Sequence, residues 1–344
     1  MPSRHAEAPD DRARLLAMIN ANWMTQAIGT AVALALPSRL AEAPQHVDTL
    51  ALACGCHAPS LHRLLRALAS LGLCDELGDA RFGLTPLGAL LRPDAPDSLH
   101  AWARLRSAQW AAWGQFEQSV TSGEGWRKRT LGADDFSHLD ADPQAAALFH
   151  GAMVALTRRI ATDVLRVVEI ADHERVVVDV GGGSGEMLIA LLLAHPALRG
   201  SVFDLEHARA GAARQFEAAG MAQRCEFVAG SFFDSVPAGA DVLVLKSVLH
   251  DWDDARCAVI LRQCRAAMAA HARLLVVERI APERFTDTPQ HRAIAGSDLN
   301  MRVALSGRER READFRALLG DAALRVTRIA PTGGEFHVIE ARAG

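Results

Sequence analysis

The feature that most constrains this chain is a glycine-rich turn that directly follows an apolar run. Val176–Val180 contains four valines and one aspartate, and the next five residues are all glycine or serine. An apolar run of this kind is typical of a strand covered on both faces, and a tight turn between a strand and a helix is typical of doubly wound α/β domains. Ligands of such domains bind beyond the carboxyl ends of the strands, so the turn is a candidate binding site.

The second half of the chain continues the alternation of strands and helices. Further strands are expected at residues 201–205, 226–229, 241–246 and 274–279, with helices at 185–195, 208–219 and 254–269. A helix at residues 311–319 precedes two segments, 324–329 and 335–341, whose apolar residues alternate with a period of two. The pattern predicts a Rossmann-like α/β domain over residues 171–344 that ends in an antiparallel pair of strands.

The spacing of the glycines selects the kind of ligand. The dinucleotide fingerprint requires glycine or alanine at its third position, but this position is Glu186 or Leu188, depending on the starting glycine. The spacing that fits is Asp179-x-Gly-x-Gly-x-Gly185, for which we expect a nucleoside that carries methionine. Asp204, at the end of the second predicted strand, is placed to accept hydrogen bonds from both ribose hydroxyls. A tight turn without a ligand is the alternative.

Composition excludes several classes of function. Half of the 344 residues are hydrophobic and the net charge is −4, which provides no field to attract nucleic acid or an anionic membrane. No apolar run reaches the ~18–20 residues that span a bilayer, so we expect a cytoplasmic protein. The six cysteines include a short Cys54-Gly-Cys56-His57 cluster, but no second ligand pair follows at zinc-site spacing. We therefore expect free thiols and no metal.

The N-terminal region predicts a second, mainly helical domain. Two helices broken near Pro37 are expected in residues 12–40. Helices at 49–56 and 60–72 predict a helix-turn-helix, and residues 73–86 predict a hairpin that turns at Gly78-Asp79. These elements together form a winged helix.

The charge of this region argues against a DNA-binding role. Its first 100 residues contain eight arginines, no lysine and ten acidic residues, whereas a DNA reader needs a basic face. We expect a winged-helix dimerisation domain at residues 1–105. A helical connector at residues 106–170, around a polar loop at 121–142, is expected to contribute to the acceptor pocket.

A histidine follows the fourth predicted strand of the α/β domain. Residues 246–254 read Lys-Ser-Val-Leu-His-Asp-Trp-Asp-Asp, which brings His250 to the same sheet edge as the glycine turn. A methyl acceptor such as a phenol must lose its proton as it attacks, and a histidine that titrates near neutrality suits this task. A structural histidine is the alternative, because the chain has 14. Asp253 or Asp254 is expected to cap the next helix.

Four segments carry a resemblance to a known family. They are residues 179–185, Phe203-Asp-Leu205, residues 246–254, and Asp298-Leu-Asn-Met301 with Gly307-Arg-Glu-Arg310. The chain resembles the plant caffeate-type and the bacterial polyketide- and phenazine-type O-methyltransferases from Leu15 to its C-terminus. The resemblance implies a homodimer that uses S-adenosyl-L-methionine, releases S-adenosyl-L-homocysteine, and methylates a hydroxyl of a small, aromatic specialised metabolite.

The resemblance also implies roles for single residues. His250 would accept the proton, and Glu278 and Glu309 would flank and orient it. Together with the glycine spacing, the resemblance assigns cofactor contacts to Asp179, Gly181, Gly183, Asp204, Ser231, Phe232 and Lys246. The residues that match the acceptor pocket are Trp126, Phe149, Met153, Asn300 and Met301. Core packing of Phe149 and Met153, and a dipole-compensating Glu309 at a helix N-terminus, are the alternatives.

The chain departs from the family pattern at two places. Ser231 stands where the family usually has an acid for the adenine amino group. Residues 126–129 read Trp-Arg-Lys-Arg, either a solvated loop or cations that meet an acidic acceptor such as a carboxylated or phosphorylated molecule.

Three rival functions remain open at this point. They are methylation of nitrogen or carbon, a catalytically silent protein that binds the cofactor, and a transcriptional regulator. The intact His250, Glu278 and Glu309 argue against the second, and the charge of the N-terminal region argues against the third.

Overall fold

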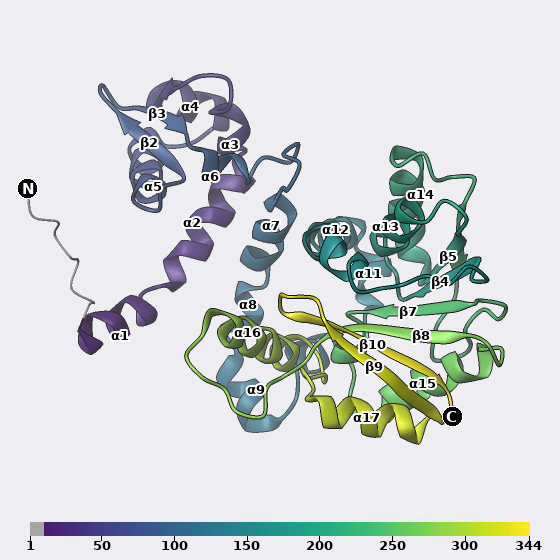
Figure 1. Cartoon of the computed structure of the whole chain (residues 1–344). Helices are drawn as coiled ribbons and strands as arrows, with labels where there is room; N and C mark the ends of the chain where they lie inside the picture. The colour runs from purple at the N-terminus through teal and green to yellow at the C-terminus, as the bar shows by residue number, and fades with distance from the viewer. Residues whose placement is uncertain (1–9) are drawn as a thin grey trace, which may run out of the picture. The chain divides into compact units, whose positions relative to one another are not determined.

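The computed structural model describes residues 10–344 and divides the chain into two compact units, Met1–Trp110 and Ala111–Gly344 (Figure 1). The first nine residues of the predicted N-terminal domain lie outside the described residues. Each unit has a hydrophobic core of its own. Among the described residues, no helix is long and apolar enough to cross a membrane. The finer division into residues 1–105, 106–170 and 171–344 stays a prediction.

The N-terminal unit contains the predicted helix-turn-helix and hairpin. α4 (Val47–Cys54) and α5 (Ala58–Ser70) precede the antiparallel strands β2 (Cys74–Leu77) and β3 (Arg81–Leu84). α5 buries Leu61, Leu65 and Leu68 at helical spacing and leaves most of its other side chains partly or fully exposed. The remaining elements of this unit are α1 (Asp11–Ile19), α2 (Asn22–Ala33), α3 (Leu36–Arg39), β1 (Gln45–His46), α6 (Pro86–Ala89) and α7 (His100–Ala108).

The predicted break near Pro37 is present between α2 and α3, but the expectation of two helices is wrong, because a further break separates α1 from α2. The first helix already ends at Ile19, and the second ends at Ala33, after which Ala35 adopts a left-handed conformation with a φ of 55°. Pro37 lies in the first turn of α3, where its missing N–H removes no intrahelical hydrogen bond. The chain therefore forms three helices here, and both breaks lie before the proline.

The C-terminal unit is built on a seven-stranded sheet with the strand order β6-β5-β4-β7-β8-β10-β9 (Figure 1). Its parallel strands are β4 (Val176–Val180), β5 (Arg199–Asp204), β6 (Cys225–Ala229), β7 (Val242–Lys246) and β8 (Arg273–Arg279). β10 (Phe336–Ala343) pairs antiparallel with both β8 and β9 (Leu324–Pro331). The fold class and the terminal antiparallel pair predicted from the sequence are confirmed.

Helices cover both faces of this sheet. Along β4, Val178 and Val180 belong to one hydrophobic cluster and Val177 belongs to the other, as the alternation of side chains along a strand requires. The cluster that contains Val177 is completed by α12 (Pro143–Leu165), α13 (Glu186–Ala194) and α14 (Arg209–Ala218). The opposite cluster is completed by α15 (Asp254–Ala267) and α17 (Glu312–Asp321). The carboxyl ends of β4, β5, β7 and β8 therefore share one edge, at which the predicted site residues follow.

Two segments of the C-terminal unit differ from expectation. Residues 121–142 are not one polar loop, because they contain α10 (Trp126–Leu131) and α11 (His138–Ala141). Residues 289–304, to which the sequence pattern assigned no element, form α16 (Pro289–Ala304), whose Thr288 side chain caps its N-terminus. Short helices complete the unit: α8 (Trp110–Trp113), α9 (Phe116–Ser122), η1 (Glu206–Ala208) and η2 (Leu249–Asp251).

Candidate functional site

His250 lies on the short helix η2, which follows β7, and the side chain of Glu278 binds the backbone of this helix. One carboxylate oxygen of Glu278, at the end of β8, accepts the backbone N–H groups of Val248 and Leu249 at 2.9 Å and that of His250 at 3.4 Å. Glu278 has no solvent exposure. A buried carboxylate with three N–H donors fixes the direction in which the chain leaves the sheet.

Arg310 holds the same segment from the other side. Its fully buried guanidinium donates to the carbonyl oxygens of Leu249 at 2.6 Å and Trp252 at 2.7 Å, and to the Asp254 carboxylate at 2.7 Å. Gly307 packs so closely on this turn that a Cβ atom there would overlap the carbonyl oxygen of His250. The Gly-Arg-Glu-Arg motif therefore fixes the backbone of the histidine as well as supplying Glu309.

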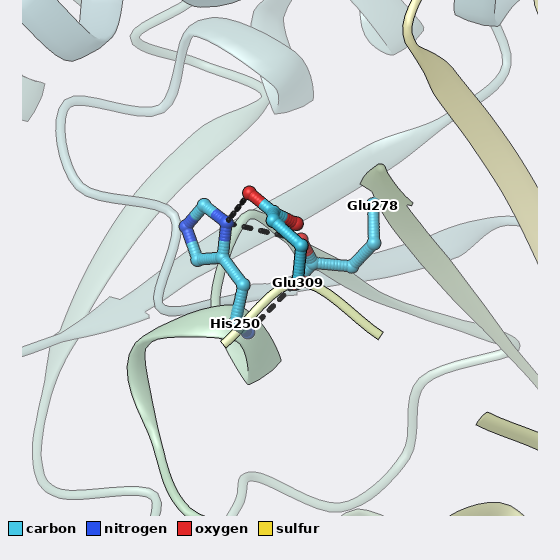
Figure 2. A group of neighbouring side chains, drawn as sticks. All are labelled: His250, Glu278 and Glu309. Atoms are coloured by element: carbon cyan, nitrogen blue, oxygen red, sulfur yellow. Dashed lines mark hydrogen bonds and ion pairs between the residues drawn. The ribbon is translucent and has the colours of Figure 1, made fainter. Parts of the chain in front are cut away.

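The structure brings the three predicted catalytic side chains together (Figure 2). Nδ1 of His250 lies 3.2 Å from Oε1 of Glu309 and 3.6 Å from Oε2 of Glu278. All three residues are buried. The opposite ring nitrogen, Nε2, lies 3.6 Å from a carboxylate oxygen of Asp251. The alternative of Glu309 as a charge that compensates a helix dipole is disfavoured, because its carboxylate is buried against the imidazole of His250.

Burial and the neighbouring carboxylates shift the pKa of His250 in opposite directions. Burial lowers the pKa of His250, but the carboxylates of Glu278, Glu309 and Asp251 outweigh burial and raise it to about 9. Burial raises the pKa of Glu309, but His250 and Arg279 oppose it and hold that pKa below its usual value. Burial raises the pKa of Asp251 to about 6. The site therefore places a basic imidazole against an ionised Glu309.

Sequence reasoning missed the residues that hold Glu309. The hydroxyl of Ser297 donates to its Oε1 at 2.6 Å, and Arg279 Nη1 lies 3.8 Å from the same atom. Asp298 accepts the backbone N–H of Glu309 at 2.8 Å. Asp298 stands inside a motif that the resemblance used, whereas nothing in the sequence pattern singles out Ser297 or Arg279.

The same three residues also have the donor types of a metal site. Their ligand atoms lie within 4.8 Å of one another, which is close enough for one cation. The positive guanidinium of Arg279 beside Glu309 already compensates part of the negative charge. The absence of a metal stays a prediction.

The glycine turn adopts the backbone that its sequence requires. Gly181, Gly183 and Gly185 have φ values of +70°, +58° and +79°, a region that side chains disfavour. The backbone N–H of Gly183 donates to Oδ2 of Asp204 at 2.7 Å. A Cβ atom at Gly181 would lie 3.4 Å from the ring of Phe232. The glycine turn after β4 thus lies close to Asp204 at the end of β5 and to Phe232, three residues after β6.

The polar groups beneath this turn fit the predicted cofactor. Asp179 is buried, and neither of its carboxylate oxygens has a hydrogen-bond partner among residues 10–344. Burial raises the pKa of Asp179 to about 7 and lowers that of Lys246, its electrostatic neighbour, to about 8. Nζ of Lys246 donates to Thr157 at 2.9 Å. Unsatisfied charge beside open glycine backbone is what a nucleoside with a charged amino-acid tail can satisfy.

Ser231, Phe149 and Met153 have fewer polar contacts than the residues around His250. The Ser231 hydroxyl accepts the backbone N–H of Phe233 at 3.2 Å, so it is engaged in its own turn. Phe149 on α12 contacts the ring of Phe136 at 5.3 Å between centroids. Met153 is half-buried on the same helix.

The other acceptor residues lie on α10 and α16, which contact each other. Asn300 is half-buried and Met301 is buried on α16, the helix that also supplies Ser297 and Asp298 to Glu309. Trp126 is half-buried on α10, and its buried indole N–H has no partner among the described residues.

The three cations after Trp126 differ in their surroundings. Arg129 donates to the Ser119 hydroxyl at 3.0 Å and to the backbone carbonyl of Glu124, and Lys128 pairs with the Glu124 carboxylate at the surface. Arg127 instead stacks on the Phe136 ring, 4.8 Å from its centroid, and forms no ion pair with a described residue. Residues 126–129 form a helix and not a solvated loop.

Comparison with known protein families gives a match in each of the two units. Residues 113–325 match the O-methyltransferase domain, and residues 16–94 match the O-methyltransferase dimerisation domain. The chain is 40% identical to the O-demethylpuromycin-O-methyltransferase of Streptomyces alboniger over 99% of this chain and 91% of that one. It is 37% identical to a phenazine O-methyltransferase of Lysobacter antibioticus over 95% of each chain.

A solved structure shows the same fold with its ligands. An O-methyltransferase from neocarzinostatin biosynthesis, crystallised with S-adenosylmethionine and 2-hydroxy-5-methyl naphthoic acid, superposes with a TM-score of 0.79 at 32% identity. The alignment covers 93% of this chain and 96% of that one. The chain belongs to the O-methyltransferase family and is an S-adenosylmethionine-dependent enzyme that acts on a small specialised metabolite.

Proposed function

We propose that His250 is the general base that removes the proton of the acceptor hydroxyl. The observation that carries this proposal is the contact of its Nδ1 with Glu309 at 3.2 Å and Glu278 at 3.6 Å. An ionised carboxylate only accepts hydrogen bonds, so Nδ1 keeps its proton and the neutral ring has its lone pair on Nε2. Glu278 and Glu309 thus act as positioning residues, like the carboxylate of a Ser-His-Asp triad.

The raised basicity of His250 suits a hydroxyl acceptor. Its pKa of about 9 lies close to that of a phenol, which is about 10 for tyrosine. General-base catalysis is efficient when base and acid have similar pKa values, because the proton then moves without a large uphill step.

For the cofactor, we propose the contacts that the glycine turn favours. When bound, S-adenosylmethionine supplies a methyl group on a positively charged sulfur. Asp204 would bind its ribose hydroxyls, and Phe232 would pack against the adenine beside Ser231. Gly181 and Gly183 would let the nucleoside approach the backbone. Asp179 and Lys246 would hold the charged amino-acid end.

The acceptor would lie between α12, α10 and α16, lined by Trp126, Phe149, Met153, Asn300 and Met301. Arg127 supports an acidic acceptor, because burial destabilises the charge of its guanidinium, and the nearby carboxylates of Asp251, Asp134 and Asp135 offset this only in part, without an ion pair. Arg129 and Lys128 are already engaged, so the preference is assigned to Arg127 alone.

We also infer a homodimer formed by the N-terminal unit. The dimerisation-domain match covers residues 16–94. Exposed apolar side chains gather on the first two helices: Leu15, Leu16, Met18, Ile19 and Trp23. Exposed apolar side chains concentrated on neighbouring helices are typical of an interface.

The base is tested with His250→Ala and the exposed histidine variant His173→Ala as its control. Purified proteins receive labelled S-adenosylmethionine and a panel of phenolic, carboxylated and N-heteroaromatic acceptors, with products read by mass spectrometry. We expect kcat to fall about 10²- to 10⁴-fold in His250→Ala, with an unchanged Kd for S-adenosylhomocysteine. EDTA should leave the wild-type rate unchanged. A wild-type rate in His250→Ala would overturn the proposal.

The acidic acceptor is tested with Arg127→Gln against the surface control Lys128→Gln. KM for a carboxylated acceptor should rise about tenfold in Arg127→Gln and remain unchanged for the neutral amide of the same acceptor. Arg127→Lys should recover part of the affinity. An equal KM change for both acceptors would show that Arg127 only supports the fold.

A further inference from the structure

A pair of histidines lies beside the glycine turn and has no part in the proposed proton transfer. Nε2 of His150, on α12, lies 3.0 Å from Nδ1 of His207, on η1, and the ring centroids are 5.1 Å apart. His150 is 8% exposed, and His207 is half-buried. The two rings share one hydrogen bond, so each fixes the orientation of the other.

The free nitrogen of His150 faces the most open point of the turn. The position that a Cβ atom would take at Gly183 lies 3.6 Å from Nδ1 of His150, and no other described atom outside the adjoining residues lies within 4 Å of that position. The N–H of the same glycine donates to Asp204 at 2.7 Å. An amide, a carboxylate and an imidazole thus converge on Gly183, and a ligand that touches its backbone comes within reach of His150.

We propose that His150 is a further cofactor-binding residue that contacts the ribose of the S-adenosyl nucleoside, and that His207 positions it. The proposal rests on the assignment of Asp204 and Gly183 to the cofactor. The adjacent Asp204 disfavours a carboxylate ligand at this point through like-charge repulsion, whereas a hydroxyl is compatible with it. A ribose hydroxyl both donates and accepts, so it fits either tautomer of the imidazole.

The electrostatics of the pair favour the same ligand chemistry. Burial, together with the neighbouring His207, lowers the pKa of His150 to about 4, so its ring is neutral under ordinary assay conditions. A neutral imidazole offers a hydrogen bond and no ion pair. His138 on α11 also lies near His207, and burial lowers its pKa as well.

The test measures binding by calorimetry, using S-adenosylhomocysteine and its 2′-deoxy and 3′-deoxy forms. His150→Leu removes the contact, and His138→Leu is the matched control that removes a neighbouring imidazole. We expect His150→Leu to weaken S-adenosylhomocysteine binding about three- to tenfold, the loss typical of one hydrogen bond, while His138→Leu binds like the wild type.

Removal of the contacted hydroxyl should cost the wild type more affinity than it costs His150→Leu. An unchanged Kd in His150→Leu, or an equal hydroxyl penalty in both proteins, would overturn the proposal. If His150→Leu does not fold, His150→Asn replaces it, because an amide can occupy the place of Nδ1. The loss of affinity on removing the ribose hydroxyl must then be more than half as large in His150→Asn as in the wild type. A smaller loss contradicts a direct contact.

The positioning role of His207 has its own pair of variants. His207→Ala should weaken binding less than His150→Leu, and His207→Asn should recover it, because its side-chain amide can restore the hydrogen bond to His150. Equal binding by His207→Ala and the wild type would refute that role. A wild type that binds no S-adenosylhomocysteine would refute the assignment of the cofactor site itself, which separates the two failures.

Discussion

The glycine turn and the His250 segment follow neighbouring parallel strands, β4 and β7, yet different contacts hold them. Local backbone conformation shapes the turn, with positive φ at three glycines within five residues. The His250 segment is held by buried charges from elsewhere in the chain, Glu278 on β8 and Arg310 before α17. The turn can therefore be recognised from a few adjacent residues, whereas the base requires several distant ones to be in place.

Among the variants that test this comparison, the largest effect is expected at Gly307, where the backbone beside the base is packed most tightly. In Gly307→Ala the new Cβ atom would overlap the carbonyl oxygen of His250, so the base must move. We expect kcat to fall about a hundredfold with cofactor affinity unchanged, because small displacements of a catalytic group carry costs of this size. Gly296→Ala is the matched control, because a Cβ atom on α16 meets nothing within 4 Å there. Equal rates in the two variants would contradict the comparison.

An effect of intermediate size is expected at the turn. Gly183→Ala combines a strained φ of +58° with a methyl group that projects into the space beside His150. We expect the Kd for S-adenosylhomocysteine to rise about tenfold, while kcat at saturating cofactor stays within a few-fold. Gly220→Ala has a similar φ of +66° and nothing within 4 Å, so it reports strain alone. Similar Kd values in both variants would show that the methyl group does not meet the cofactor.

The smallest effect concerns the protonation of His250. Because Glu309 is one of the carboxylates that raise the His250 pKa to about 9, Glu309→Gln should lower that pKa. The rate rises with pH as the imidazole becomes neutral, so the rising limb of kcat/KM should move to lower pH by about one unit. The control is Glu312→Gln, which removes a half-exposed carboxylate from α17. A limb that stays in place or moves to higher pH would contradict the role of Glu309.

Prediction from sequence worked best for elements whose apolar spacing and turn residues lie within the element itself. The strand Val176–Val180 has the predicted bounds, because both of its neighbours are strands and four of its five residues are valine. The α5 helix and the hairpin were also found, because apolar spacing and a turn signal lie within a few residues. Near Pro37 the sequence indicated the break but not its exact position, because proline is compatible with the first turn of a helix.

The sequence by itself determined the α/β class, the nucleoside-type glycine turn and the identity of His250 as the candidate base, because each depends on contiguous residues. Only the tertiary structure decided which partners surround that histidine. Arg279 on β8 and Ser297 on α16 contact Glu309, and Arg310 before α17 holds the backbone beside His250; no local pattern relates these positions. The same holds for His150 and His207, which are 57 residues apart and meet because α12 and η1 pack beside the glycine turn.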